Sequence, residues 1–219
     1  MKKTILLIAC IAMLFFTGCA DNEEPFIQEN YTIEAAQAEH IIIDVRDRLI
    51  NVTPSNDDQI HISYYQNNKE YYEINLSNDK ILTIEGIYNK EWMDFIGKIT
   101  DIENRTITLN IPNNLIDELY ISTTNEDVSL SDIEINNNIT IVTNGSNIFF
   151  DKINVYDSIT LNAKNGNITG TIIGGYDDYA IFCNVKKGNC NLPYEKQDGS
   201  KTLNVTVNNG DIEIDFIKK

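Results

Sequence analysis

The sequence predicts an all-β protein, built as a right-handed parallel β-helix or β-solenoid-like stack of repeats with an N-terminal β-strand region. Three observations predict this class. The 219 residues include 36 Ile and 29 Asn, and Ile favours strands whereas Asn favours tight turns. Apolar residues alternate along many short segments, as they do in strands. The second half of the chain also repeats itself at about twenty residues.

Residues 1–18 are predicted to be a lipoprotein signal peptide. The apolar run from Ile5 to Phe16 follows two lysines and is shorter than the about 20 residues that a spanning helix needs. The run ends in Phe-Thr-Gly-Cys, which resembles the bacterial lipobox, where the Cys is lipidated and becomes the mature N-terminus. This resemblance implies lipidation of Cys19 and makes the acidic residues 19–30 a tether. An ordinary signal peptide with an incidental Cys is the alternative.

Residues 31–112 form the N-terminal strand region. Its strand segments alternate or run apolar and are rich in β-branched and aromatic residues. The segments are separated by polar breaks such as Arg46-Asp47-Arg48. The predicted strands are 40–45, 49–54, 59–65, 71–76, 80–86 and 106–112. This region lacks the twenty-residue period.

Residues 113–219 hold five repeats of 20–22 residues. Each repeat has three alternating inward positions, a polar corner and a further inward position, and the corners contain Asn or Gly, which tolerate positive φ. The repeats begin at Leu119, Ile139, Ile159, Ile181 and Leu203.

Two architectures fit these repeats. Asn-Gly corners between alternating strands are typical of hairpins and would give an antiparallel meander or sandwich. A fixed period instead indicates a solenoid in which each coil stacks on the preceding one. The near-constant register favours the solenoid, which would also align corner Asn residues in amide ladders. Because no linker separates the two halves, residues 31–219 are predicted to form a single all-β domain.

A strand that ends in Ile111-Pro112, followed by repeats with Asn-Gly corners, resembles the bacterial "putative adhesin" family, a β-strand-repeat domain of unknown function (4097). The resemblance implies a β-helix or β-roll, and it offers no catalytic residues to carry over. The first repeat departs from the pattern with Glu126 and Asp127 in place of Gly.

Composition and motifs exclude several classes of function. With 33 acidic and 17 basic residues and a net charge of −16, the chain is not expected to bind nucleic acid. His40 and His61 lie on strands and are expected to be paired or solvent-facing rather than ligands. The acidic corners are expected to be solvated turns rather than Ca²⁺ sites. We therefore predict no catalytic site, no metal and no cofactor.

Cys183 and Cys190 flank a Gly corner in the fourth repeat. Both align with apolar core positions, so two buried thiols are one interpretation. A disulfide in an oxidising exterior is the other, and the sequence leaves both open.

The segment from Asn89 to Ile99 interrupts the strand pattern. Trp92, Phe95 and Ile96 fall on one face at helical spacing. They predict either a cap over an open end of the solenoid, which such folds need, or an exposed binding loop.

These features together predict a non-catalytic, extracytoplasmic lipoprotein, held to the cell membrane by its lipid, that acts as an adhesin or binding module. Its partner would be an unknown surface ligand. The alternatives are an envelope sensory or regulatory component that binds a membrane protein, and a polysaccharide-active enzyme. The last would need carboxylates clustered on one solenoid face.

Overall fold

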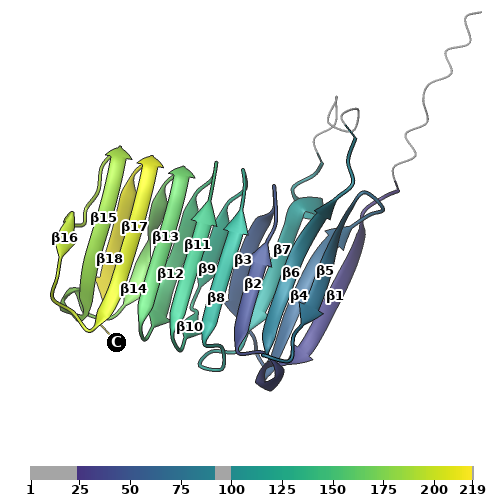
Figure 1. Cartoon of the computed structure of the whole chain (residues 1–219), viewed down its shortest axis with the longest axis horizontal. Coiled ribbons are helices and arrows are strands. Elements are labelled where there is room, and N and C mark those ends of the chain that lie inside the picture. Colours follow the sequence, from purple (N-terminus) through teal and green to yellow (C-terminus); the bar gives the residue numbers. More distant parts are fainter. Residues whose placement is uncertain (1–23, 92–99, 219) are drawn as a thin grey trace, which may run out of the picture.

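The computed structural model describes residues 24–91 and 100–218. Within them the chain forms two facing β-sheets of nine strands each, stacked along one long axis (Figure 1). The predicted all-β, solenoid-like class is confirmed. The only helices in these ranges are single 3-10 turns, and none of them has the length and apolar character needed to cross a membrane.

The two sheets are named here by their strand orders. Sheet A runs β1-β4-β7-β3-β9-β12-β14-β18, with β10 paired to β12, and sheet B runs β16-β15-β17-β13-β11-β8-β2-β6-β5. The bounds are β1 Ile27–Glu34, η1 Ala35–Gln37, β2 His40–Asp44, β3 Leu49–Pro54, β4 Gln59–Gln66, β5 Glu70–Leu76, β6 Ile81–Tyr88, η3 Glu103–Arg105, β7 Thr106–Ile111, β8 Glu118–Thr123, β9 Val128–Ser131, β10 Glu134–Ile135, β11 Asn138–Thr143, β12 Ile148–Val155, β13 Ser158–Asn165, β14 Ile168–Ile173, η4 Tyr176–Asp178, β15 Tyr179–Lys187, β16 Glu195–Lys196, β17 Lys201–Asn209 and β18 Ile212–Ile217.

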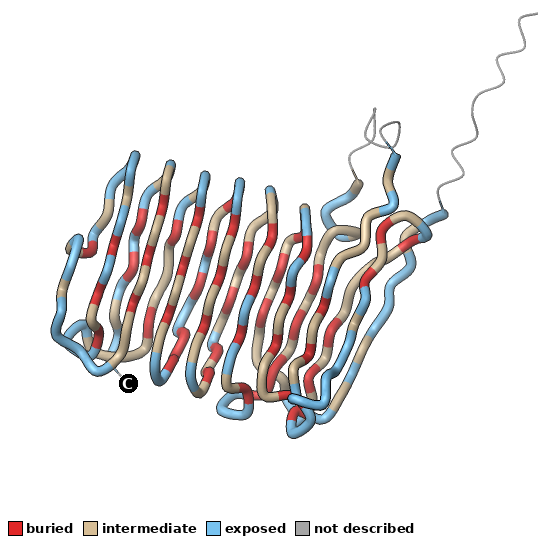
Figure 2. Tube along the Cα trace, in the orientation of Figure 1, coloured by how far each residue is buried: buried red, intermediate tan, exposed pale blue. Residues whose placement is uncertain are grey.

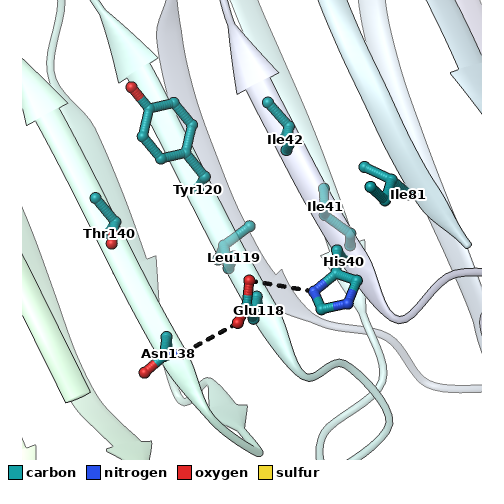
Figure 3. A pocket seen from close by; sticks show the side chains of 9 residues that line it. All are labelled: His40, Ile41, Ile42, Ile81, Glu118, Leu119, Tyr120, Asn138 and Thr140. Carbon is teal, nitrogen blue, oxygen red and sulfur yellow. Dashed lines mark hydrogen bonds and ion pairs between the residues drawn. The ribbon is translucent and has the colours of Figure 1, made fainter. Parts of the chain in front are cut away.

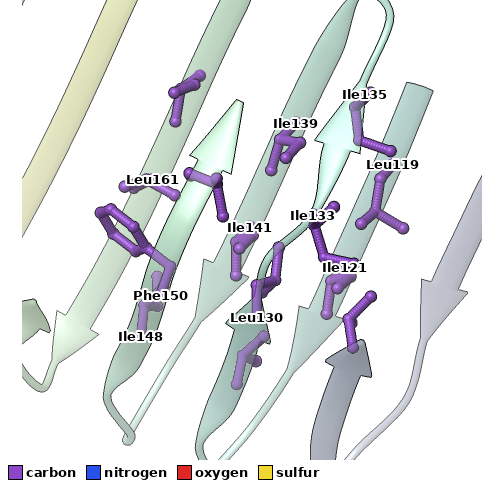
Figure 4. Close-up of a cluster of buried hydrophobic side chains, with 14 of the residues drawn as sticks. Leu119, Ile121, Leu130, Ile133, Ile135, Ile139, Ile141, Ile148, Phe150 and Leu161 are labelled. Atoms are coloured by element: carbon purple, nitrogen blue, oxygen red, sulfur yellow. The ribbon is translucent and has the colours of Figure 1, made fainter. Parts of the chain in front are cut away.

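The core lies between the sheets and follows from strand alternation. Buried residues alternate with more exposed ones along most strands (Figure 2), because successive side chains point to opposite faces. Parallel pairing puts Ile121, Ile141 and Leu161 side by side, and all three are fully buried (Figure 4). Each coil therefore buries its apolar positions against the equivalent positions of its neighbours.

The N-terminal region contains a coil of the same kind, contrary to the expectation that it lacks the repeat. Ile41 of β2 pairs with Leu119, and Ile50 of β3 pairs with Val128. The step from Ile41 to Ile50 is nine residues, as is the step from Leu119 to Val128. The unit thus keeps its internal spacing, but Ile41 and Leu119 are 78 positions apart, so a search for a twenty-residue period does not find it.

The coils do not stack in chain order at either end. β17 lies between β13 and β15, and β2 lies between β6 and β8. Sequential stacking was therefore the wrong expectation for the last two repeats. All coils share the same inward and outward positions. The last two repeats can therefore exchange places in the stack, and inward residues still lie beside inward residues.

Antiparallel pairing is found at the two ends of the stack. β1 pairs with β4 and β4 with β7 at one end, and β5 pairs with β6. The short β16 pairs antiparallel with β15 at the other end. The first of these strands begins at Ile27, four residues inside the predicted tether, because its residues continue the backbone pairing with β4. The meander that we considered as an alternative describes only these ends.

One row of corners carries a ladder in which Asn and Asp side-chain oxygens accept backbone N–H groups, where stacked Asn amides were expected. Asp127 Oδ1 accepts the backbone N–H of Asn147 at 2.8 Å, and Asn147 Oδ1 accepts that of Asn167 at 2.9 Å. Asn167 Oδ1 accepts from Asp211 at 2.9 Å, and Asp211 Oδ1 accepts from Asn189 at 2.7 Å. The ladder follows the order of the coils in space, so it satisfies corner N–H groups that sheet pairing leaves free.

The corner glycines fill a different need. Gly210 has φ +150, and a Cβ on it would lie 2.1 Å from the carbonyl oxygen of Gly166 in the adjacent coil. Gly174 has a similar φ of +145, but its nearest neighbour would lie 3.4 Å away. Gly210 is therefore required both by its backbone conformation and by the close stacking of coils.

Gly210→Ala is expected to destabilise the protein more than Gly174→Ala. Gly174→Ala is the control, because it adds only the backbone strain of about 1–3 kcal/mol. Gly210→Ala adds this strain and also forces two stacked corners apart. Urea denaturation measures both free energies of unfolding. Equal losses would contradict the close-stacking argument.

Candidate functional site

The predicted site residues divide between the described and undescribed parts of the chain. Cys19 and the segment with Trp92, Phe95 and Ile96 lie outside the described residues. Only Cys183 and Cys190 lie within them. Candidate sites were therefore sought among the grooves and polar clusters of residues 24–91 and 100–218.

A groove of about 350 Å³ crosses the outer face of sheet B at β2, β8 and β11. Its floor is made by the strands themselves, and its outward side chains come from four neighbouring strands (Figure 3). Tyr120, which is 37% exposed, lies close to Ile42 on one side. The lining residues are His40, Ile41, Ile42, Ile81, Glu118, Leu119, Tyr120, Asn138 and Thr140.

A row of polar side chains borders this groove. His40 Nδ1 lies 3.2 Å from Glu118 Oε2, and Asn138 Nδ2 donates to Glu118 Oε1 at 3.1 Å. Ser158 Oγ in turn donates to Asn138 Oδ1 at 2.6 Å. These residues occupy the same register position on successive coils, so the repeat itself brings them together. The groove thus joins an apolar, aromatic side to a row of pre-oriented polar groups, as binding sites commonly do.

The histidines are paired, as predicted. His40 contacts Glu118, while His61 Nε2 lies 2.9 Å from Asp57 Oδ1 and its Nδ1 lies 3.2 Å from Thr32 Oγ1. The hydrogen bond from His61 holds the pKa of the exposed Asp57 below its usual value. Sequence reasoning did not identify His40 as a groove residue, because the signal is its alignment with Glu118 across 78 residues.

A second groove, of about 250 Å³, lies on the same face near the opposite end of the sheet. Phe182 of β15 is 45% exposed and Tyr194 is 78% exposed. The amide side chains of Asn184 and Asn204 also line it. Sheet B therefore carries two grooves that each combine an exposed aromatic ring with amide groups.

A buried charge cluster near the N-terminal end joins β5 to the turn before β3 and to the residues after β6. Arg48 lies in the predicted polar break at 46–48, between β2 and β3, but it is only 1% exposed. Its Nη2 donates to Glu70 Oε2 at 2.7 Å and its Nε donates to Tyr72 Oη at 2.5 Å. Lys90 Nζ contacts the other oxygen of Glu70. Burial raises the pKa of Tyr72 to about 12, so this hydroxyl stays protonated. The cluster is enclosed by protein, and we assign it a structural role.

The two cysteines meet in the terminal coil. Cys183 Sγ lies 2.8 Å from Cys190 Sγ, and both are present as free thiols. Burial, together with the neighbouring thiol, raises the pKa of Cys183 to about 12. This thiol is therefore protonated near neutral pH and is not an activated nucleophile. The disulfide stays a prediction.

Comparison with protein families identifies the chain. A family model described as Toastrack DUF4097 matches residues 38–219. The chain belongs to the Toastrack DUF4097 family. The resemblance inferred from the Ile-Pro strand end and the Asn-Gly corners is thereby confirmed. Among curated proteins, the search found no match.

Several solved structures resemble the chain at low sequence identity. A "putative cell adhesion protein" from Clostridium sporogenes ATCC 15579 has a TM-score of 0.62 at 12% identity, over 88% of this chain and 100% of that chain. A "putative adhesin" from Bacteroides fragilis NCTC 9343 has a TM-score of 0.32 at 11% identity, over 89% and 98% of the two chains. A "Putative lipid binding protein" from Parabacteroides distasonis ATCC 8503 has a TM-score of 0.26 at 11% identity, over 87% and 96%. The first of these shows a shared fold.

Glu70→Gln is expected to lower the free energy of unfolding by about 3–5 kcal/mol, because it leaves buried cations without their counter-ion. Asp132→Asn makes the same chemical change at the exposed ion pair with Lys152, where both side chains are at least half exposed. There the expected loss is below about 1 kcal/mol. Urea denaturation of both variants is the measurement, and similar losses would show that the Arg48 cluster is not a stabilising unit.

Treatment with oxidised glutathione is expected to convert the two thiols into a Cys183–Cys190 disulfide, with release of two glutathione thiols. Lys186 and Lys187 lie between the cysteines, so trypsin separates the two cysteine peptides unless a disulfide joins them. Mass spectrometry with and without reductant detects that link. The loop-entropy model gives a stabilisation of about 2.5 kcal/mol, and Cys190→Ala is the control. Two alkylatable thiols after oxidation would instead support the free-thiol interpretation.

Proposed function

We propose that this protein is a non-catalytic binding module of the bacterial envelope, adhesin-like in function and tethered by a lipid on Cys19. The observation that carries the proposal is the groove on the outer face of sheet B, where Tyr120 and Ile42 lie beside the row from His40 to Ser158. The groove lies on a rigid sheet, so its polar groups are already oriented before a ligand arrives. Preorganisation of this kind lowers the entropic cost of binding.

The chemistry of the groove supports binding rather than hydrolysis. Among the residues that line it, Glu118 is the single carboxylate, and both of its oxygens are engaged by His40 and Asn138. Most glycoside hydrolases use two carboxyl groups that flank the scissile bond. The condition that we set for a polysaccharide-active enzyme, several acids on one solenoid face, is thus not met in this groove.

The family and the topology support an envelope location. One solved structure of the same fold is named a "putative cell adhesion protein", and the signal pattern before Cys19 implies export and lipidation. β1 is the edge strand of sheet A at one end of the stack. A tether that precedes β1 would therefore hold the stack by its end and leave the sheet faces free for a ligand. Two acyl chains suffice for stable anchoring.

The test is a binding screen with the lipoprotein purified from membranes in detergent. Envelope and host-surface glycans and proteins are the ligands, and saturable binding to at least one is expected. Tyr120→Ala should weaken that binding about tenfold or more, the equivalent of 1.4 kcal/mol. Phe149→Ala is the matched control, because Phe149 is an exposed aromatic residue on sheet A.

Unchanged affinity in Tyr120→Ala would show that the groove is not the binding site. An absence of saturable binding across the screen would contradict the proposed function itself. Thermal unfolding of each variant establishes that the fold is retained.

A further inference from the structure

Five consecutive strands of sheet B form one continuous surface between the two grooves. β8, β11, β13, β17 and β15 are parallel and in register, so their outward side chains line up in rows across the strands. Three outward positions on each strand make up this central face, and all are at least partly exposed. The face ends before the next outward positions of β13 and β15, which are the exposed Lys164 and Lys186. The residues of the central face are Glu118, Tyr120, Ser122, Asn138, Thr140, Val142, Ser158, Thr160, Asn162, Thr202, Asn204, Thr206, Ala180, Phe182 and Asn184.

The central face is uncharged apart from one residue. Fourteen of its fifteen side chains carry no charge, in a chain that has 33 acidic residues and a net charge of −16. Sheet A differs over the same coils, since Asp151, Glu213 and Asp215 are exposed on its outer face. The neutrality of the central face is therefore a local property and does not follow from composition.

The middle row of this face ends in an aromatic residue on each side. It runs Tyr120, Thr140, Thr160, Asn204, Phe182 with one residue per strand. Neighbouring strands are about 4.8 Å apart, so four steps place the two aromatic positions about 19 Å apart. Each aromatic residue also lines a groove of its own.

We propose that the central face is an extended binding track for a linear, uncharged polysaccharide that lies across the strands, with Tyr120 and Phe182 as platforms for its sugar rings. The inference rests on the proposed binding function and names its ligand class. Thr, Ser and Asn side chains both donate and accept hydrogen bonds, which matches the hydroxyl groups of sugars. The aromatic rings of Tyr120 and Phe182 can pack against the apolar faces of sugar rings.

Other occupants fit this face less well. β8, β11, β13 and β17 have a long strand on each side, so their backbone groups are already paired. β15 is paired by β16 only at Ile181 and Phe182, so a peptide added as a strand would lie along the edge of β15 and not across this face. A protein interface has an apolar or aromatic centre, whereas the centre of this face is Thr and Asn. An anionic polymer would be repelled by the net charge of −16.

The experiment measures the affinity of the membrane-purified lipoprotein for uncharged β-glucan, mannan and chitin oligosaccharides, from single sugars to hexamers. For the series that binds, affinity should rise with length until the track is filled and then level off. Phe182→Ala and Thr160→Glu should each weaken hexamer binding about tenfold or more and should affect single sugars less. Thr108→Glu is the matched control, because Thr108 faces outward on sheet A between Asn51 and Ser63.

The outcomes separate the track from the proposed function. Binding that depends on Tyr120 but not on length, Phe182 or Thr160 would overturn the track and leave a single-groove binding module. Binding of a protein or an anionic glycan at this face, with no response to any uncharged oligosaccharide, would overturn the ligand class alone. The absence of any saturable ligand would overturn both proposals.

Discussion

The structure depends on one constraint, namely that each coil must place its inward apolar residues directly beside those of its neighbours. Parallel, in-register pairing satisfies it, as in the row of Ile121, Ile141 and Leu161. The same pairing brings corner beside corner, so that side chains such as Asn147 and Asn167 can accept the backbone N–H groups of the next coil. It also leaves so little room that Gly210 must lack a Cβ. The apolar core, the corner ladder and the corner glycines therefore share one physical cause.

The same constraint generates the outer faces on which the proposed functions rest. Alternation along a strand turns every second residue outward, and the register then aligns these residues across many coils. The row from His40 through Glu118 and Asn138 to Ser158 arises in this way, as does the uncharged central face of sheet B. A site on such a face is broad, rigid and repetitive, which suits a long ligand better than a compact one. Catalysis, in contrast, requires several groups that converge on one atom.

The two ends of the stack differ from its centre, because further coils could in principle be added there and the chain must end the stack. Antiparallel strands β1, β4 and β5 extend the two sheets beyond the N-terminal coils, and the buried ion pair of Arg48 and Glu70 connects β5 to the turn before β3. At the other end β16 pairs with β15, and the amide of Asn191 exchanges hydrogen bonds with the backbone of Ile214 in the exposed edge strand β18. β1, β5 and β18 remain edge strands of the two sheets, and the contacts of Asn191 satisfy part of the backbone of β18.

The sequence by itself determined the all-β class, the repeat unit and the polar corners, because alternation and spacing are local properties that strand geometry translates directly into inward and outward positions. It also predicted that the histidines are paired or solvent-facing, and it left a disulfide and two buried thiols as alternatives for Cys183 and Cys190. Only the tertiary structure decided the order of the coils. β17 pairs in the same register with both β13 and β15, so the sequence pattern does not distinguish the order β13-β17-β15 from the chain order β13-β15-β17. It alone revealed the coil at Ile41 and Ile50, the burial of Arg48 and the grooves of sheet B. Each of these brings together residues far apart in the chain, such as His40 and Glu118, and the spacing between them carries no periodic signal.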